Sequence, residues 1–327
     1  MLAFWKDNKF SYALLGVVLL ALPFFLKSGY LIHIVITTGV FVILVSGLDV
    51  MLGYTGYLSL AQQTFLGLGG YTSALLAMRL HLSFIPSLLA AGLMCGIAGF
   101  LVGAVCLRFR SHFFILVSIS FAMIAEIVCI NLVSVTNGPM GITGIPRPVI
   151  NLGFVKYTLT SHTQCYFLIV VLAIVMVFLK QRIINSRIGR AFKAIRENEE
   201  LAKSVGVNTF AFSLLAFVLS GIYGGFAGAF YAHYVNYLSP EMFGFGYMLT
   251  MLVMLSIGGK GTLAGPILGA IVVSFLPEYL RVVKIYRMPI FGIVLLLMTI
   301  YMPEGIIRSI RLIPSGVRGL RVWRSSK

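Results

Sequence analysis

The chain has 327 residues, of which 59% are hydrophobic and 10% are charged, and its mean hydropathy is +1.00. A soluble domain of this length needs a charged surface, so the composition excludes a soluble globular protein and indicates a polytopic membrane protein. The formal net charge of +16 could suggest binding to nucleic acid. The basic residues, however, lie between apolar runs and near the C-terminus, as in the cytoplasmic loops of membrane proteins, and we expect no nucleic-acid partner.

Ten apolar runs predict transmembrane helices. Each is long enough, or nearly so, to cross about 30 Å of hydrocarbon as a helix. We expect helices because lipid cannot satisfy open backbone groups and because the alternation of a transmembrane barrel is absent. The run 246–258 is short and could be a broken or re-entrant helix, so a total of eight or nine spans stays open. The predicted fold is an all-α transmembrane bundle in one domain, residues 1–327, with runs at 11–26, 30–48, 58–79, 84–107, 112–134, 164–180, 210–235, 246–258, 262–281 and 288–302.

The positions of the basic residues predict on which side of the membrane each loop lies. Ten spans with the N-terminus inside place 18 basic residues on one side and seven on the other. Cytoplasmic loops are enriched in Lys and Arg, so both termini and residues 180–207 are predicted to be cytoplasmic. The basic group between Arg281 and Arg287 opposes this assignment, because it falls on the side with fewer basic residues.

The longest segment predicted on the opposite side is 134–162. Its glycines and prolines break both the helical and the strand period, which predicts a structured loop or a pair of turns. Such a segment could cover the mouth of a pathway, dock a partner or simply connect two spans.

A polar insert, residues 182–208, interrupts the apolar chain and predicts two short helices. Ile188, Phe192 and Ile195 recur at i, i+4 and i+7, and basic residues fill the other faces. The second helical piece ends at Gly206, a typical C-terminal stop. The insert is too short and too charged to span a membrane. It could place apolar side chains such as Phe192 in the groove of a soluble partner, or lie through its arginines on anionic lipid headgroups.

Small residues predict close contacts between helices. Gly221 and Gly225 lie four residues apart and therefore share one helix face, which predicts a packing seam. A second pattern, G-x-x-G-x-L, occurs twice, each time just before a predicted span and in the same direction across the membrane. That direction favours a parallel internal repeat over an inverted one, although six positions can also agree by chance. The glycines of this pattern are Gly53, Gly56, Gly258 and Gly261.

No residue pattern typical of catalysis or metal binding occurs in the sequence. There is no H-E-x-x-H, no paired carboxylate and no G-x-S-x-G, and the four cysteines lack C-x-x-C spacing. The stretch 256–262 fails the phosphate-loop pattern, because Gly261 rather than Ser or Thr follows Lys260. We therefore expect no catalytic residue, no metal site and no cofactor on this chain, so any ATP and magnesium would be bound by a partner chain.

A few polar residues fall within or beside the predicted spans. Glu126 is the only acid in the middle of an apolar run, which makes it a candidate pathway contact or proton site. Its alternative role is a hydrogen bond to a neighbouring helix. Ser59 and Gln62 are further candidates for a pathway or an intramembrane polar contact. Asp49 lies near the end of a predicted span, where we expect an interfacial position.

The end of the polar insert resembles a known signature. Glu200-Leu-Ala-x-x-x-Gly206 is similar to the E-A-A-x-x-x-G pattern of the permeases of ABC importers, with Leu201 in place of the central alanine. Further stretches resemble the branched-chain amino-acid permeases and follow one another in that family's order over residues 47–306. They are 53–71, 136–146, 186–208, 257–270 and 302–307.

The resemblance implies an inner-membrane subunit of a bacterial ABC importer of the leucine, isoleucine and valine type. It also implies a homologous second permease, two cytoplasmic ATP-binding subunits, a periplasmic or extracellular solute-binding protein and surrounding membrane lipids. The positions carried over to this chain form an ATPase-coupling element, to which we add Phe192 as a contact residue. They are Arg187, Gly189, Arg190, Arg196, Glu200, Ala202 and Gly206.

Three positions depart from the family's first motif and leave the substrate open. Tyr57 stands where glutamine is frequent, Ala61 replaces a usual glycine and Thr64 replaces a usual alanine. Permeases for urea and short-chain amides share the same pattern, so they are the alternative within the family. An ion-coupled secondary carrier is the alternative from another class, but it would need a relay of intramembrane acids.

Overall fold

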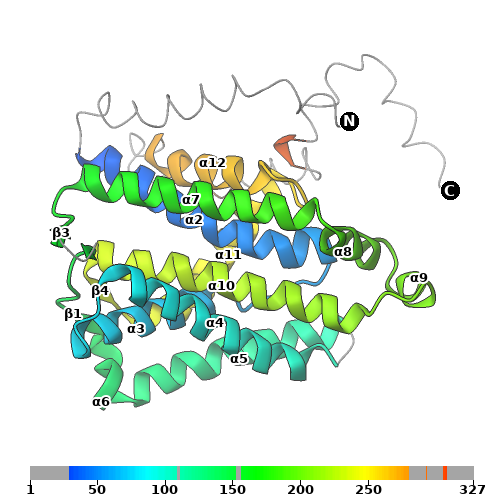
Figure 1. Ribbon diagram of the computed structural model, residues 1–327, viewed down its shortest axis with the longest axis horizontal. Helices are drawn as coiled ribbons and strands as arrows, with labels where there is room; N and C mark the ends of the chain where they lie inside the picture. The colour runs from blue at the N-terminus through cyan, green and yellow to red at the C-terminus, as the bar shows by residue number, and fades with distance from the viewer. Residues whose placement is uncertain (1–28, 109–110, 152–155, 280–291, 293–304, 308–327) are drawn as a thin grey trace.

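The computed structural model describes residues 29–108, 111–151, 156–279, 292 and 305–307 (Figure 1). The predicted run 11–26 and nearly all of 288–302 lie outside these residues, so the total of about ten spans and the side of both termini stay predictions. The other eight predicted runs all contain helices. Five described helices, α2, α4, α5, α7 and α10, are long and apolar enough to cross a membrane. The chain is therefore an all-α helical membrane protein, as the composition predicted.

The described elements follow the hydropathy pattern closely, and the short run 246–258 is a helix of 14 residues. In chain order the elements are α2 (Gly29–Thr55), α3 (Gln62–Arg79), α4 (Phe84–Cys106), α5 (Ser111–Asn131), α6 (Val133–Thr136), η2 (Gly138–Met140), β1 (Ile142–Thr143), β2 (Val149–Asn151), β3 (Lys156–Thr158), α7 (His162–Ile184), α8 (Arg187–Glu197), α9 (Glu199–Ser204), α10 (Thr209–Val235), β4 (Tyr237–Leu238), η3 (Pro240–Phe243), α11 (Phe245–Gly258) and α12 (Gly265–Tyr279).

The long helices run side by side along the long axis of the molecule, and the two ends of the bundle differ (Figure 1). α10 packs against α4, α3 and α2, while α2 also contacts α7, α11 and α12. One end carries α8 and α9 (Figure 1), and the opposite end carries the small antiparallel pairs β1–β4 and β2–β3. The described residues of the segment 134–162 thus form short strands, turns and short helical pieces, as its glycines and prolines suggested, and lie at the end of the bundle away from the polar insert.

Small residues let α10 approach its neighbours at backbone distance. A Cβ on Gly225 would lie 2.7 Å from the carbonyl oxygen of Ala91, and one on Gly221 would lie 2.8 Å from that of Cys95. The predicted seam therefore rests on α4. On α3, a Cβ on Gly69 would lie 2.5 Å from the Cα of Gly225. Without a hydrophobic driving force between helices in lipid, such close van der Waals packing is what holds a membrane bundle together.

We predict that Gly225→Val destabilises the bundle by about 1–3 kcal/mol, because the added side chain overlaps the α4 backbone. The measurement is thermal unfolding in detergent, followed by a thiol-reactive dye that detects exposure of the buried cysteines. Gly246→Val is the matched control, since a Cβ on Gly246 meets nothing within 4 Å. Equal transition temperatures for the two variants would show that the α10–α4 contact tolerates a larger residue.

Candidate functional site

α8 begins directly after α7 and lies flat against the end of the bundle. The Ser186 hydroxyl accepts a hydrogen bond of 3.1 Å from the backbone N–H of Ile188 and so caps the helix. Gly189 lies so close to the backbone of Ile184 that a Cβ would overlap its carbonyl oxygen. The turn between α7 and α8 is therefore tight, and a movement of α8 acts directly on the end of α7.

The apolar face of α8 packs inside this chain and leaves its basic face open. Phe192 is fully buried, with its ring edge-on to that of Phe212 at 6.5 Å, and Ile195 is 4% exposed. The expectation that Phe192 enters a partner's groove is thus wrong, because the same i, i+4, i+7 stripe covers the end of the helical bundle instead. Arg187 and Arg190 are exposed on the outer face.

α9 forms the tip of this end of the molecule (Figure 1). Leu201 on α9 and Val205 directly after it are 63% and 72% exposed, while Ala202 is buried. Gly206 follows with a φ of +84°, and the backbone N–H of Val207 then donates to the carbonyl oxygen of Ala202 at 3.0 Å. This left-handed glycine ends the helix and turns the chain into α10. Two exposed apolar side chains on a short, charged helix are suited to contact a soluble partner.

Glu199 ties α9 to the bundle. Its carboxylate accepts hydrogen bonds from the Tyr57 hydroxyl at 2.8 Å and the Thr209 hydroxyl at 3.3 Å, and it pairs with Lys203 at 2.9 Å. Burial opposes ionisation, but these three partners outweigh it and hold the pKa of Glu199 below its usual value. Tyr57, one of the three departures from the family pattern, therefore supplies a direct link between the loop after α2 and α9.

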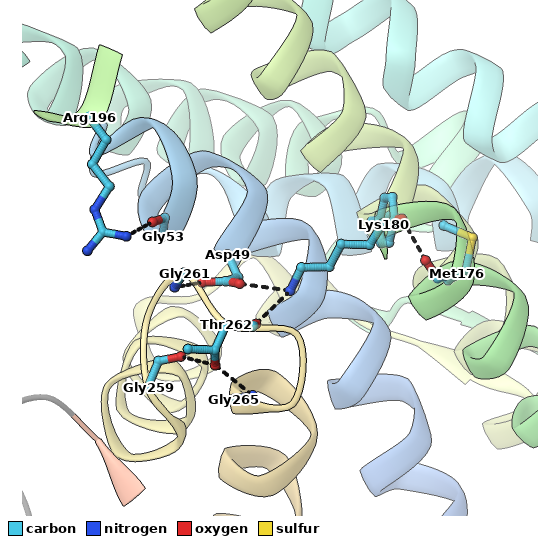
Figure 2. Close-up of polar contacts among 10 residues, drawn as sticks. Asp49, Gly53, Met176, Lys180, Arg196, Gly259, Gly261, Thr262 and Gly265 are labelled. Carbon is cyan, nitrogen blue, oxygen red and sulfur yellow. Dashed lines mark hydrogen bonds and ion pairs between the residues drawn. The ribbon is translucent and has the colours of Figure 1, made fainter. Parts of the chain in front are cut away.

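A buried ion pair lies behind α8 and was missed by the sequence reading (Figure 2). The Lys180 ammonium on α7 lies 2.7 Å from the carboxylate of Asp49 on α2, and both side chains have 0% exposure. Asp49 is therefore shielded inside the bundle, while the depth in the membrane expected for it stays a prediction, and Lys180 belongs to α7 rather than to the loop after it.

The ion pair also binds the backbone of the turn between α11 and α12 (Figure 2). The other carboxylate oxygen of Asp49 accepts from the Gly261 N–H at 2.7 Å, and Lys180 donates to the carbonyl oxygen of Thr262 at 3.4 Å. The ammonium also lies 5.7 Å from the centre of the Tyr54 ring. Each charge thus has its partner and at least one backbone contact, which is the condition for burying it.

The two G-x-x-G-x-L segments, far apart in sequence, meet at this place. The Arg196 guanidinium at the end of α8 donates to the carbonyl oxygen of Gly53 at 2.6 Å (Figure 2). A Cβ on Gly53 would lie 2.5 Å from the Gly261 nitrogen, and one on Gly261 would lie 2.7 Å from the Gly53 oxygen. Gly56, with a φ of +81°, lies beside the stem of Arg196. Glycine is required here because neighbouring atoms occupy the space of a side chain.

The remaining predicted residues lie elsewhere. Gln62 is buried between helices: its amide donates to the carbonyl oxygens of Leu44 and Ser220 at 3.2 Å each, and its oxygen accepts from the Ser220 hydroxyl at 2.6 Å. Ser59 is buried in the loop before α3, and Gly258 packs against the start of α12. Glu126 is half-buried on α5 and forms no hydrogen bond or ion pair with the described residues, so its pathway role stays a prediction.

A bundle of long apolar helices with a short, charged two-helix insert at one end defines a helical membrane protein. The sequence profile of the family described as "Branched-chain amino acid transport system / permease component" matches residues 30–302. The chain belongs to this family, and it is accordingly a membrane-spanning permease component of an ABC transport system.

The chain is similar to several transport permeases. The chain is 33% identical to the high-affinity branched-chain amino acid transport system permease protein LivM of Escherichia coli K12, over 92% of this chain and 75% of the relative. It is 24% identical to the probable branched-chain amino acid transport permease protein LivM of Methanocaldococcus jannaschii, over 67% and 68%. It is also 26% identical to the autoinducer 2 import system permease protein LsrC of Escherichia coli K12 DH10B, over 92% and 89%. No solved structure gives a significant match.

We predict that Lys180→Met lowers the free energy of unfolding by about 3–5 kcal/mol, because it leaves the Asp49 carboxylate buried without its cation. The same thiol-dye unfolding measurement in detergent tests this. Lys203→Met is the matched control: it removes a lysine from an ion pair whose side chains are 49% and 37% exposed, and such pairs contribute about 0.5 kcal/mol or less. Similar losses for the two variants would contradict a strongly stabilising role for the buried cation.

Proposed function

We propose that this chain is the membrane-spanning permease subunit of an ATP-driven importer of branched-chain amino acids in the inner membrane of a bacterium. Family membership supports an ABC permease, and the 33% identity to LivM of Escherichia coli K12 over most of both chains supports the substrate. The partners would be a homologous second permease, two ATP-binding subunits and a solute-binding protein. One observation carries the proposal: the apolar side chains of Leu201 and Val205 are exposed at the tip of an insert whose helices are capped and hydrogen-bonded to the bundle.

The insert would serve as the coupling element between the ATP-binding subunits and the spans. Leu201 and Val205 would enter a groove of an ATP-binding subunit, and the exposed charges of Arg187, Arg190 and Glu200 would steer the contact. Closure of the ATP-binding subunits would then displace α9 and α8, and with them the helices that they contact. Alternating access is an equilibrium between two arrangements of the spans, which nucleotide and the loaded binding protein would both shift. No residue of this chain is assigned a covalent step.

The orientation follows from the same contact. The end of the bundle that carries α8, α9 and the exposed Lys260 would face the cytoplasm, and the β1–β4 and β2–β3 pairs would face the binding protein. The basic residues of the insert support this orientation. The Gly- and Pro-rich segment 134–162 would form part of the outer surface.

Two alternatives differ in what they predict. The 26% identity to the autoinducer 2 permease LsrC keeps a different cargo within the same family open, as do the urea and amide permeases. An ion-coupled carrier would need several free intramembrane acids, whereas Asp49 is neutralised by Lys180 and Glu126 lies apart from it on α5. Among the described residues nothing connects these two acids into a relay.

We predict that Gly206→Pro and Arg196→Glu each abolish uptake while membrane insertion is retained. Proline cannot adopt the φ of +84° found at Gly206, and glutamate replaces the donor that binds the Gly53 carbonyl with an acceptor. Uptake of radiolabelled leucine by cells that express the whole transporter measures the effect, with the amount of chain in membranes determined in parallel. Arg108→Glu, the same charge reversal at an exposed position after α4 and outside the insert, is the control and should transport normally. Normal uptake by either test variant would refute the coupling role of the insert.

The cargo is tested on the assembled complex. We expect leucine, isoleucine and valine, each presented by the cognate solute-binding protein, to stimulate ATP hydrolysis several-fold, because the loaded binding protein shifts the transport equilibrium. Phosphate release is measured for each ligand, with urea and autoinducer 2 as competing candidates. Stimulation by one of these and not by the amino acids would assign the chain to another substrate class of its family. Uptake that persists without the ATP-binding subunits but follows the proton gradient would support a carrier.

A further inference from the structure

We propose that the Asp49–Lys180 ion pair, together with Arg196, is the joint that passes movement of α8 to the transmembrane helices and to the α11–α12 turn. These residues would be positioning residues for transport rather than contacts of ATP or cargo. The inference rests on the proposed function, since it assumes that α8 and α9 receive the movement of ATP-binding subunits.

The first argument is that the ion pair joins three segments far apart in the chain. Asp49 belongs to α2, Lys180 to α7, and the turn that contributes Gly261 and Thr262 lies between α11 and α12 (Figure 2). The pair makes two contacts with this turn: the Asp49 carboxylate accepts from the Gly261 N–H, and the Lys180 ammonium donates to the Thr262 carbonyl. The turn is itself braced, because the Thr262 hydroxyl donates to the Gly259 carbonyl at 2.9 Å and accepts from the Gly265 N–H at 3.0 Å.

The second argument is that α2 is held on both sides of α8 in the chain. At its C-terminal end α8 is attached to α2 directly, because Arg196 donates to Gly53, which lies one turn beyond Asp49 on α2. Before its N-terminal end the attachment runs through α7, since Lys180 lies one helical turn before Ile184, where α7 ends, and α8 begins at Arg187. A displacement of α8 that moves the end of α7 with it would therefore act on two successive turns of α2.

The third argument concerns the chemistry of the joint. A pair of apolar residues of similar volume would hold α2 against α7 at least as firmly as an ion pair, because both charges must lose their water. An ion pair with directed backbone bonds differs from apolar packing in that it specifies one register of the two helices and one position of the turn. Such a contact is suited to an element that moves as a unit between two arrangements.

The test distinguishes an ion pair that transmits movement from one that only stabilises the fold. In Asp49→Asn/Lys180→Met, asparagine retains an acceptor for the Gly261 N–H and methionine fills the space of the lysine stem, so no charge is left buried alone. The complete transporter with its loaded binding protein is reconstituted in vesicles, and leucine uptake and phosphate release are measured together. We expect assembly at the normal yield with uptake per ATP hydrolysed lowered at least tenfold. Uptake per ATP within twofold of the unaltered complex overturns the proposal.

Ser73→Ala is the matched control. It removes another buried contact between helices, the hydrogen bond of 2.9 Å between the Ser73 hydroxyl on α3 and Nε2 of His233 on α10. Because this bond involves neither the ion pair, the turn nor α8, uptake per ATP should be unchanged. A tenfold loss in the control as well would show that any weakened helix contact uncouples the transporter, which also overturns the proposal.

A second variant decides the outcome if the double variant fails to assemble. Arg196→Met keeps the stem beside Gly56 but removes the donor to the Gly53 carbonyl, on a residue that is exposed and therefore not needed for folding. If the proposal is right, this variant also shows the low leucine uptake per ATP hydrolysed. An unchanged uptake per ATP refutes the proposal. A failure of the proposed function looks different, since the unaltered complex would then hydrolyse ATP without importing leucine.

Discussion

Two opposite charges buried at one place between apolar helices constrain the whole insert-bearing end of this protein. Asp49 and Lys180 each lie in a helix that is otherwise suited to lipid, and neither could remain ionised there without the other. Their pairing fixes α2 against α7. The second carboxylate oxygen of Asp49 and the ammonium of Lys180 also bind the backbone between α11 and α12. With that turn in place, Gly53 and Gly261 are in contact, and the guanidinium of Arg196 lies beside both glycines.

The burial of the apolar face of α8 changes where a partner can bind. Phe192 and Ile195 fill the end of the bundle, so α8 forms a rigid base and leaves little apolar surface for another protein. The exposed Leu201 lies on α9 and the exposed Val205 directly after it, and α9 is fixed by Glu199 to both Tyr57 and Thr209. The proposed function therefore assigns docking and transmission to different helices. A partner would contact α9, and the firmly packed α8 would carry the displacement inward, which a flexible loop could not do.

Hydropathy predicted the helices because the membrane imposes them, and Gly206 predicted the C-terminal end of the short tip helix. The surface against which the apolar face of α8 packs was not predictable in the same way. The i, i+4, i+7 stripe of Phe192 fits a partner's groove and this chain's own bundle equally well, and only the tertiary packing decides. Asp49 and Lys180 stand 131 positions apart, so no local pattern joins them. A usable signal existed, however, in that a lone acid and a lone base each adjoin a long apolar run and each needs a counter-charge.

Two glycines of the G-x-x-G-x-L segments receive a physical explanation from the same contact. Any side chain on Gly53 would overlap the Asp49 carboxylate, and any side chain on Gly261 would overlap the Arg196 guanidinium. Both glycines are thus demanded by the charged groups that converge on them. Gly53 is the first glycine of its segment, whereas Gly261 is the second of its own, so the contact does not join equivalent positions. It explains each of these glycines by its own surroundings, and the parallel internal repeat stays a prediction.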